Sequence, residues 1–216
     1  MRLEVWSDIV CPWCYLGKRR LEKALGEFEH ADEVEVTWRS FQLDPSYPKG
    51  EPRPVPEALR EKLGVSPAQV AAMQRQVTAL AAEEGLDYHL DRSIMANTFD
   101  AHRLTHLARE YGLGTELHER LLRANLVEAE NVDDTETLVR LGTEVGVPAE
   151  AARRVLAGDE YATEVEADIA QARAFGASGV PFFVLDRRYG ISGAQPVEAF
   201  LSALRTAHRE LGAGAR

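Results

Sequence analysis

The sequence predicts an α/β protein in which one small sheet is interrupted by a large helical insertion. Three observations support this. A strand-like segment, a helix and a second strand-like segment fill residues 2–43, a long run of helical spacing follows, and strand-like segments return at Pro181 before a final helix. We therefore expect the first half of the sheet domain in residues 1–50, the insertion in 51–175 and the second half in 176–216.

The opening segment has β-α-β character. RLEVWS (residues 2–7) and VEVTWRSFQL (34–43) are rich in β-branched and aromatic residues, and the second alternates apolar with polar positions. Between them, apolar positions from Cys14 to Phe28 follow a helical spacing, and Pro12 suits a first helical turn. A crossover of about twenty residues should be right-handed, which would make the two strands parallel.

The middle of the chain is predicted to form several helices. Ser66 and Pro67 are a cap and first-turn pair, and Asn97 and Thr98 are capping candidates before a helix that starts at Phe99. Further helices are expected over residues 117–127, 135–145, 148–156 and 161–175.

The last segment is predicted to form a β-hairpin and a helix. PFFVLD (residues 181–186) and YGISGA (189–194) flank a short turn at Arg187 and Arg188. Pro196 then opens a final helix.

Composition narrows the classes of partner. The chain has 45% hydrophobic and 28% charged residues and a formal net charge of −10, with one dense basic run, Lys18-Arg19-Arg20. We interpret this run as a solvated helix face and expect no nucleic-acid partner. No apolar run reaches the roughly 18 residues of a membrane span, so no membrane partner is expected. The start of the chain has no signal-peptide pattern, which predicts a cytoplasmic protein.

Both cysteines of the chain lie in the segment SDIVCPWCYLGKRR. Cys11 should end the first strand and Cys14 should lie in the first helical turn, a spacing that suits a disulfide. Free N–H groups and the positive end of a helix stabilise a thiolate there, mainly on the outer sulfur. Because the thiolate is the attacking species, Cys11 would attack a substrate disulfide and Cys14 would resolve the mixed disulfide.

Two other readings of the cysteine pair are open at this point. The cysteines could both be buried and unreactive. They could also bind zinc together with His102 and His106, which are spaced i, i+4 on one predicted helix. The pair at a strand-to-helix junction, with a proline inside it, favours the redox interpretation, and we expect no metal.

The stretch SGVPFF carries a second signal. A proline ahead of an apolar strand implies a strand start or an edge position. If the Val180–Pro181 bond were cis, the backbone of Val180 would lie beside the cysteines, where an extended substrate segment could pair with it. The sequence alone favours the trans form, since few X–Pro bonds are cis.

Three segments now carry a family resemblance. SDIVCPWCYLGKRRLE, NTFDAHRLTHLA and GVPFFVLDRRYGISGAQ resemble the cytoplasmic FrnE-type dithiol oxidoreductases, in the DsbA-like branch of the thioredoxin superfamily. The resemblance implies a thioredoxin-like fold, with a four-stranded mixed sheet of order 2-1-3-4 and the insertion over the active-site end. It also implies that Cys11 is the nucleophile, that Cys14 is the resolving thiol and that Pro181 is a cis-proline.

The same branch contains 2-hydroxychromene-2-carboxylate isomerases and kappa-class glutathione transferases, which resemble this chain in fold. They typically have a serine at the place of Cys11 and use bound glutathione, whereas Cys11 and Cys14 are both present here. The resemblance therefore favours a thiol–disulfide oxidoreductase with no cofactor beyond its redox-active disulfide. A glutathione-dependent isomerase or transferase is the alternative function, and a non-enzymatic binding or chaperone module is a third. Glutathione, a thioredoxin system or an oxidant would be the partner that recycles the pair.

Substrate contacts are predicted at four residues around the cysteines: Pro12, Trp13, Val180 and Pro181. Trp13 should be exposed, while Trp6 and Trp38 fit strands better and should be core residues. Asp8 could assist proton transfer, but we interpret it as a solvated loop residue. A polar and aromatic patch either lines the insertion's side of the cleft or caps and packs its helix: Asn97, Phe99, His102 and His106.

Overall fold

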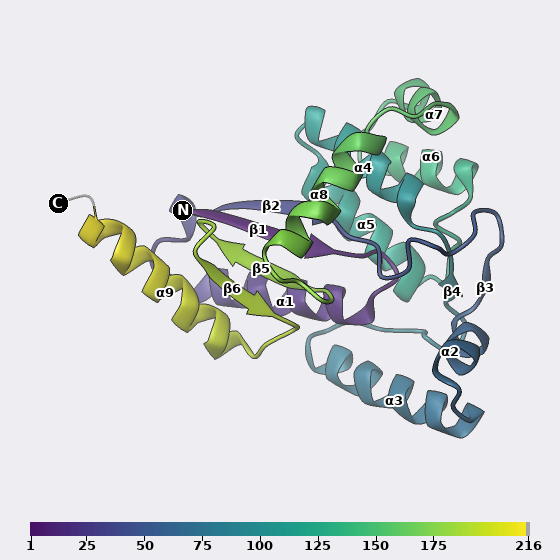
Figure 1. Ribbon diagram of the computed structural model, residues 1–216, viewed down its shortest axis with the longest axis horizontal. Helices are drawn as coiled ribbons and strands as arrows, with labels where there is room; N and C mark the ends of the chain where they lie inside the picture. The colour runs from purple at the N-terminus through teal and green to yellow at the C-terminus, as the bar shows by residue number, and fades with distance from the viewer. Residues whose placement is uncertain (215–216) are drawn as a thin grey trace.

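The computed structural model describes residues 1–214, with side chains described for residues 1–210. Its centre is a four-stranded sheet of order β2-β1-β5-β6 (Figure 1). β1 pairs parallel with β2, and β5 pairs antiparallel with both β1 and β6. The predicted mixed sheet of order 2-1-3-4 is therefore confirmed. The strands are β1 (Arg2–Ser7), β2 (Glu35–Ser40), β5 (Phe182–Leu185) and β6 (Tyr189–Ser192).

Helices cover both faces of this sheet (Figure 1). Side chains alternate along β1, so Leu3 and Val5 pack against α1 (Pro12–Glu27) and α9 (Val197–Gly214). Trp6 points to the opposite face, where it packs against α8 (Ala162–Ala174) and donates a 2.7 Å hydrogen bond to the carbonyl oxygen of Asp168. Trp6 and Trp38 are buried, as predicted.

The insertion between β2 and β5 is almost entirely helical. Helices α4 to α7 bury a shared apolar core, and α3 packs near the start of α1. The helices are α2 (Val55–Leu63), α3 (Pro67–Glu83), α4 (Phe99–Glu110), α5 (Gly114–Leu126), α6 (Thr135–Glu144) and α7 (Ala149–Ala157), followed by α8.

The predicted helix starts are partly confirmed. Ser66 caps α3 through a capping box with Gln69. Thr98 occupies the N-cap position of α4 but makes no side-chain cap bond. The carboxamide oxygen of Asn97 instead accepts a 2.9 Å hydrogen bond from the N–H of Phe99.

Three short elements were not predicted: α2, the single-turn helix η1 (Ala31–Glu33), and a small sheet of β3 (Arg53–Pro54) and β4 (Ile94–Met95). The strands β3 and β4 have two residues each, which is too short for an alternation pattern to register.

The basic run on α1 is not the solvated face that we predicted. Lys18 is only 3% exposed, lies over the Trp38 ring at 5.7 Å and forms a 2.8 Å ion pair with Glu119. Arg20 pairs with Glu84 at 2.9 Å. These partners come from distant elements, so the run joins α1 to the insertion.

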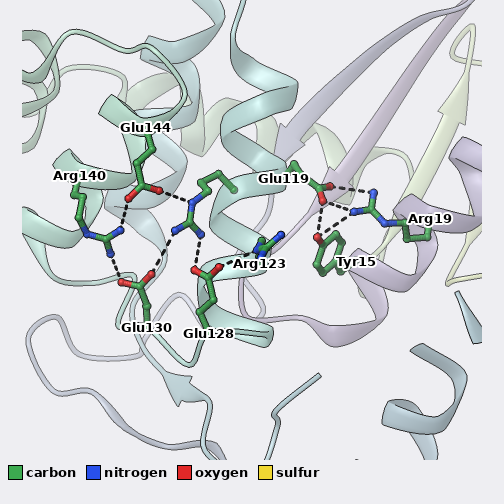
Figure 2. A network of polar contacts seen from close by, with 9 residues as sticks. Tyr15, Arg19, Glu119, Arg123, Glu128, Glu130, Arg140 and Glu144 are labelled. Carbon is green, nitrogen blue, oxygen red and sulfur yellow. Dashed lines mark hydrogen bonds and ion pairs between the residues drawn. The ribbon is translucent and has the colours of Figure 1, made fainter. Parts of the chain in front are cut away.

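Ion pairs connect α5 to elements on two sides (Figure 2). Glu119 accepts hydrogen bonds from Arg19 and from the hydroxyl of Tyr15, both on α1. Arg120, the next residue on α5, forms ion pairs with Glu128 and with Glu144 of α6, each at 2.7 Å. Single exposed pairs stabilise a fold by only about 0–1 kcal/mol, but a connected set orients the helices that share it.

None of the helices in the described part of the chain combines the length and hydropathy that a membrane span requires.

Candidate active site

The two cysteines lie where β1 gives way to α1. Cys11 is the N-cap residue, with extended backbone angles (φ −93°, ψ 110°), and Pro12 follows in the first helical turn. The N–H of Cys14 donates a 3.0 Å hydrogen bond to the carbonyl oxygen of Cys11, which closes the turn. Both thiols are free, and the two residues are 3% and 0% exposed. The two side chains lie near each other in one cluster of buried residues.

The loop before β5 lies directly against this pair. The Val180–Pro181 bond is cis, as the family resemblance implied and the sequence alone did not. The Cys11 thiol donates a 3.6 Å hydrogen bond to the carbonyl oxygen of Val180. α1 approaches the loop so closely that a Cβ atom on Gly17 would lie 2.9 Å from Cγ of Pro181. Glycine is therefore required at this position for the observed packing.

Cys14 is held as a thiol by its surroundings. Burial raises the pKa of Cys14 well above its ordinary value, and the hydrogen bond to Cys11 and the charge on Cys11 raise it further. Two groups act in the opposite direction: the N–H of Asp8, which donates to Sγ of Cys14 at 3.5 Å, and the side chain of Ser7. Cys14 can therefore become a nucleophile only after a nearby group or water takes its proton.

Asp8 is buried, so our interpretation of it as a solvated loop residue was wrong. Its side chain is 2% exposed, and Oδ2 accepts a 2.8 Å hydrogen bond from the N–H of Leu43. Oδ1 lies 3.3 Å from Nε2 of His102 on α4. Asp8 thereby connects the segment before Cys11 to the chain after β2 and to the insertion. All of these partners are distant in sequence, which is why local composition gave no signal.

His118 is a second buried group that the sequence did not reveal. Its Nε2 lies 2.9 Å from Oγ of Ser7, and its ring stacks on Trp38 with centroids 4.1 Å apart. Burial lowers the pKa of His118 well below its ordinary value, and the nearby charge of Lys18 lowers it further. His118 is therefore neutral in the fold. Ser7 lies between this imidazole and Cys14, so the three side chains form one buried polar group beside the cysteine pair.

Asn97, His102 and His106 of the predicted patch are buried, and Phe99 is half-buried. His102 and His106 are 3% and 8% exposed, so neither lines an open cleft. Nε2 of His106 lies 3.2 Å from both Oγ of Ser40 and Oδ2 of Asp168. The Asn97 side chain, in addition to receiving the Phe99 N–H, donates to the carbonyl oxygen of Tyr47.

A zinc site shared with the cysteines would need His102 and His106 to lie beside them. Among the side chains of residues 1–210, neither of these α4 histidines shares a potential metal-binding group with the cysteines. The patch therefore caps α4 and holds it against the sheet.

Aromatic side chains surround the cysteine motif. Trp13 is 41% exposed, as predicted, and leaves an apolar surface next to Cys11. Tyr88, which the sequence did not single out, is buried and donates a 2.6 Å hydrogen bond to the carbonyl oxygen of Pro12. Its ring lies 6.2 Å from that of Tyr15. The Tyr88 hydrogen bond holds the backbone of the motif at Pro12.

Comparison with known proteins identifies the family. Residues 2–205 match the family model of the DSBA-like thioredoxin domain. The chain belongs to this family. It is 50% identical to the probable DsbA oxidoreductase SCO1869 from Streptomyces coelicolor, covering 97% of this chain and 91% of that one with a TM-score of 0.94. The predicted family and thioredoxin-like fold are thus confirmed.

Two more distant structures share the fold alone. The cytosolic disulfide reductase DsbM from Pseudomonas aeruginosa, in a structure with GSH, is 21% identical with a TM-score of 0.68, covering 97% of this chain and 100% of that one. A 2-hydroxychromene-2-carboxylate isomerase is 16% identical with a TM-score of 0.70, covering 98% of each chain.

Proposed function

We propose that this DsbA-like protein is a thiol–disulfide oxidoreductase that works through reversible oxidation of the Cys11–Cys14 pair. One observation carries the proposal. The two cysteines lie near each other at the N-terminus of α1, with Sγ of Cys11 3.6 Å from the backbone of Val180. Cys11 is the N-cap residue of that helix, a position at which reactive cysteines are found in proteins.

The exchange proceeds in two displacements. The thiolate of Cys11 attacks one sulfur of a substrate disulfide, which forms a mixed disulfide and releases the other sulfur as a thiolate. Cys14 then loses its proton, and its thiolate attacks Sγ of Cys11. This forms the Cys11–Cys14 disulfide and releases the second substrate thiolate. The substrate gains two electrons and the cysteine pair loses two; the reverse sequence oxidises a dithiol.

The substrate would lie across the motif and the Val180 loop. The backbone of Val180 can pair with an extended segment on either side of the reacting sulfur, as an added strand does at a sheet edge. Trp13 would supply an apolar contact beside it, and Pro12 and Pro181 would form the adjoining surface. A backbone-directed site of this kind accepts both polypeptides and small peptides, so protein and small-molecule disulfides are both candidate substrates.

When the protein acts as a reductase, a thiol partner must restore the reduced pair in each cycle; when it oxidises dithiols, an oxidant restores the disulfide. Two molecules of glutathione can restore the reduced pair: together they give two electrons and two protons to the Cys11–Cys14 disulfide and leave as one molecule of glutathione disulfide. A dithiol protein of the thioredoxin system is the other candidate. The structure of DsbM with GSH supports glutathione as a ligand of this fold. Either partner would be available in the cytoplasm, where we expect the protein to act.

The reduction potential of the pair tests the proposal. The protein is equilibrated in glutathione redox buffers, free thiols are trapped by alkylation, and the oxidised and reduced forms are counted by mass. A potential near −270 mV, that of thioredoxin, would indicate a reductase, and one near −120 mV an oxidant of dithiols. The absence of a reversible two-electron couple would refute the oxidoreductase function. Glutathione-dependent activity that survived Cys14→Ala would instead support an isomerase or transferase.

A further inference from the structure

A second chemically distinctive cluster lies far from the cysteine pair. The chain has six histidines, and His102, His106 and His118 are buried. Of the other three, His30 and His208 meet just beyond the C-terminal end of α1, whereas the cysteines lie at its start. A helix of 16 residues is roughly 24 Å long, so the cluster is remote from the redox site.

Three potential metal ligands converge in this cluster. Nδ1 of His30 lies 3.1 Å from Oε1 of Glu33, and Nε2 of His208 lies 3.2 Å from Oε2 of the same carboxylate. The three ligand atoms are all within 4.8 Å of one another. The two imidazole rings stack at a centroid distance of 3.9 Å with an interplanar angle of 13°.

The surrounding fold holds these side chains together. His30 is the N-cap residue and Glu33 the last residue of the 3₁₀ turn η1, in which residues i and i+3 lie on the same face. His208 comes from α9, which packs on α1. The buried ring of Phe28 contacts both imidazoles edge-on, each at 5.8 Å. The cluster is therefore built from two segments at opposite ends of the chain and supported by a core residue.

We propose that His30, Glu33 and His208 form a binding site for a divalent transition-metal cation of the zinc class. Two imidazoles and one carboxylate are a ligand set that Zn²⁺ accepts in tetrahedral sites, with water in the fourth position. In the structure, the Glu33 carboxylate makes a hydrogen bond with each imidazole. A bound cation would take the place of these two hydrogen bonds. One ring must turn out of the stack so that both nitrogen lone pairs meet. The exposed fractions of His30 and His208, 46% and 26%, leave room for that turn.

The local charge also favours a cation. Glu33 is more than half exposed, and among the side chains of residues 1–210 no Arg or Lys forms an ion pair with its carboxylate. The N-terminal ammonium of Met1 bonds to its backbone carbonyl oxygen instead, at 2.7 Å, which leaves the carboxylate charge available to the metal. Arg205 of α9 forms its ion pair with Glu29 instead. A bound cation would tie α9 to the segment between α1 and β2, and metal binding would therefore raise the thermal stability of the protein.

Zinc titration of the full chain tests the site. The Cys11→Ser/Cys14→Ser double variant serves as the background because the thiol pair can itself bind zinc. We expect calorimetry to show one zinc per chain, and a rise in Tm with zinc concentration. His208→Ala and Glu33→Gln should each weaken binding at least about tenfold and abolish the rise in Tm.

The matched control is His89→Ala. His89 is also exposed and lies 3.5 Å from a carboxylate, that of Asp87, but has no second histidine beside it. Its removal should leave zinc binding unchanged. No binding at 100-fold excess zinc, unchanged binding in His208→Ala, or an equal loss in His89→Ala would each overturn the proposal. Should His208→Ala fail to fold, His30→Ala replaces it, because His30 lies outside the regular elements and is more exposed.

Discussion

Sγ of Cys11 lies 3.6 Å from the carbonyl oxygen of Val180, although 169 residues separate the two. Strand pairing explains why they meet. Trp6 of β1 lies opposite Phe182 of β5. The segment that leaves β1 and the loop that enters β5 are therefore at the same end of these two neighbouring strands. The helical insertion can lengthen the chain between them without moving either one. The geometry of the site therefore depends on how closely α1 packs on this loop.

Gly17→Ala should disturb that packing. The added Cβ would lie 2.9 Å from Cγ of Pro181 and 3.3 Å from Cζ of Phe183, and a proline ring cannot swing away as a flexible chain would. We expect a loss of about 1–3 kcal/mol in the free energy of unfolding, together with reduced disulfide exchange. Urea unfolding and an insulin reduction assay measure the two effects.

Gly26→Ala is the control on the same helix. Nothing lies within 4 Å of the Cβ that it would add, so it should raise stability by up to about 1 kcal/mol through helix propensity alone. If the two alanine variants behaved alike, close packing between α1 and the Pro181 loop would be excluded as the cause.

The stability of the reduced protein should fall in alkaline solution because Cys14 resists ionisation. Burial raises the pKa of Cys14 in the folded state, while the unfolded cysteine ionises near pH 8.5. Above that pH the unfolded chain loses a proton that the folded chain keeps, so the stabilising contribution is complete below pH 8.5 and declines as the pH rises. Between pH 7.5 and 9.5 the decline should be about 1 kcal/mol.

The comparison is made between reduced wild type and reduced Cys14→Ala, by urea unfolding at both pH values. The variant lacks the Cys14 thiol, so the difference between the two proteins reports the contribution of that thiol. The variant should lose less stability than the wild type over this interval. Equal losses would show that Cys14 is not shielded in the folded state.

The sheet and the cysteine motif could be predicted because their signals are local. Alternation between apolar and polar residues revealed β2, and the spacing of Cys11, Pro12 and Cys14 placed the motif at a strand-to-helix junction. The cis form of Val180–Pro181 was different, since only the family resemblance indicated it.

The buried polar groups could not be predicted, because burial is set by partners far along the chain. Asp8 resembles a loop residue until Leu43 and His102 enclose it. Lys18 resembles part of a solvated run until Glu119 and the Trp38 ring cover it. In each case the sequence shows a charged residue in an ordinary setting, and only tertiary packing gives it a role.

His118 should make the protein sensitive to mild acid. Its folded-state pKa is held well below the ordinary value by burial and by Lys18, whereas an unfolded histidine takes up a proton near pH 6.5. Stability from this group is therefore complete above pH 6.5 and is lost as the pH falls. Between pH 7.5 and 5.5 the loss should be about 1 kcal/mol.

Urea unfolding of wild type and His118→Gln at these two pH values measures the effect. Glutamine does not titrate, and its amide can still reach Ser7, so the variant should show the smaller loss. Carboxyl groups titrate alike in both proteins and cancel in the difference. A variant as acid-sensitive as the wild type would mean that His118 is protonated in the fold.

Trp13 should matter for polypeptide substrates and not for stability. Its ring is 41% exposed beside Cys11, so Trp13→Ala should change the free energy of unfolding by less than about 0.5 kcal/mol. On the proposed function, the ring packs on the polypeptide that carries the substrate disulfide. Its loss should therefore raise the KM for insulin in the reduction assay roughly fivefold, which corresponds to about 1 kcal/mol of binding free energy. Exchange with glutathione disulfide, which is too small to cover the ring fully, should change less.

Tyr111→Ala is the control, because Tyr111 is 47% exposed at the C-terminal end of α4, away from the cysteines. A fivefold effect in both variants, or in neither, would remove Trp13 from the substrate surface.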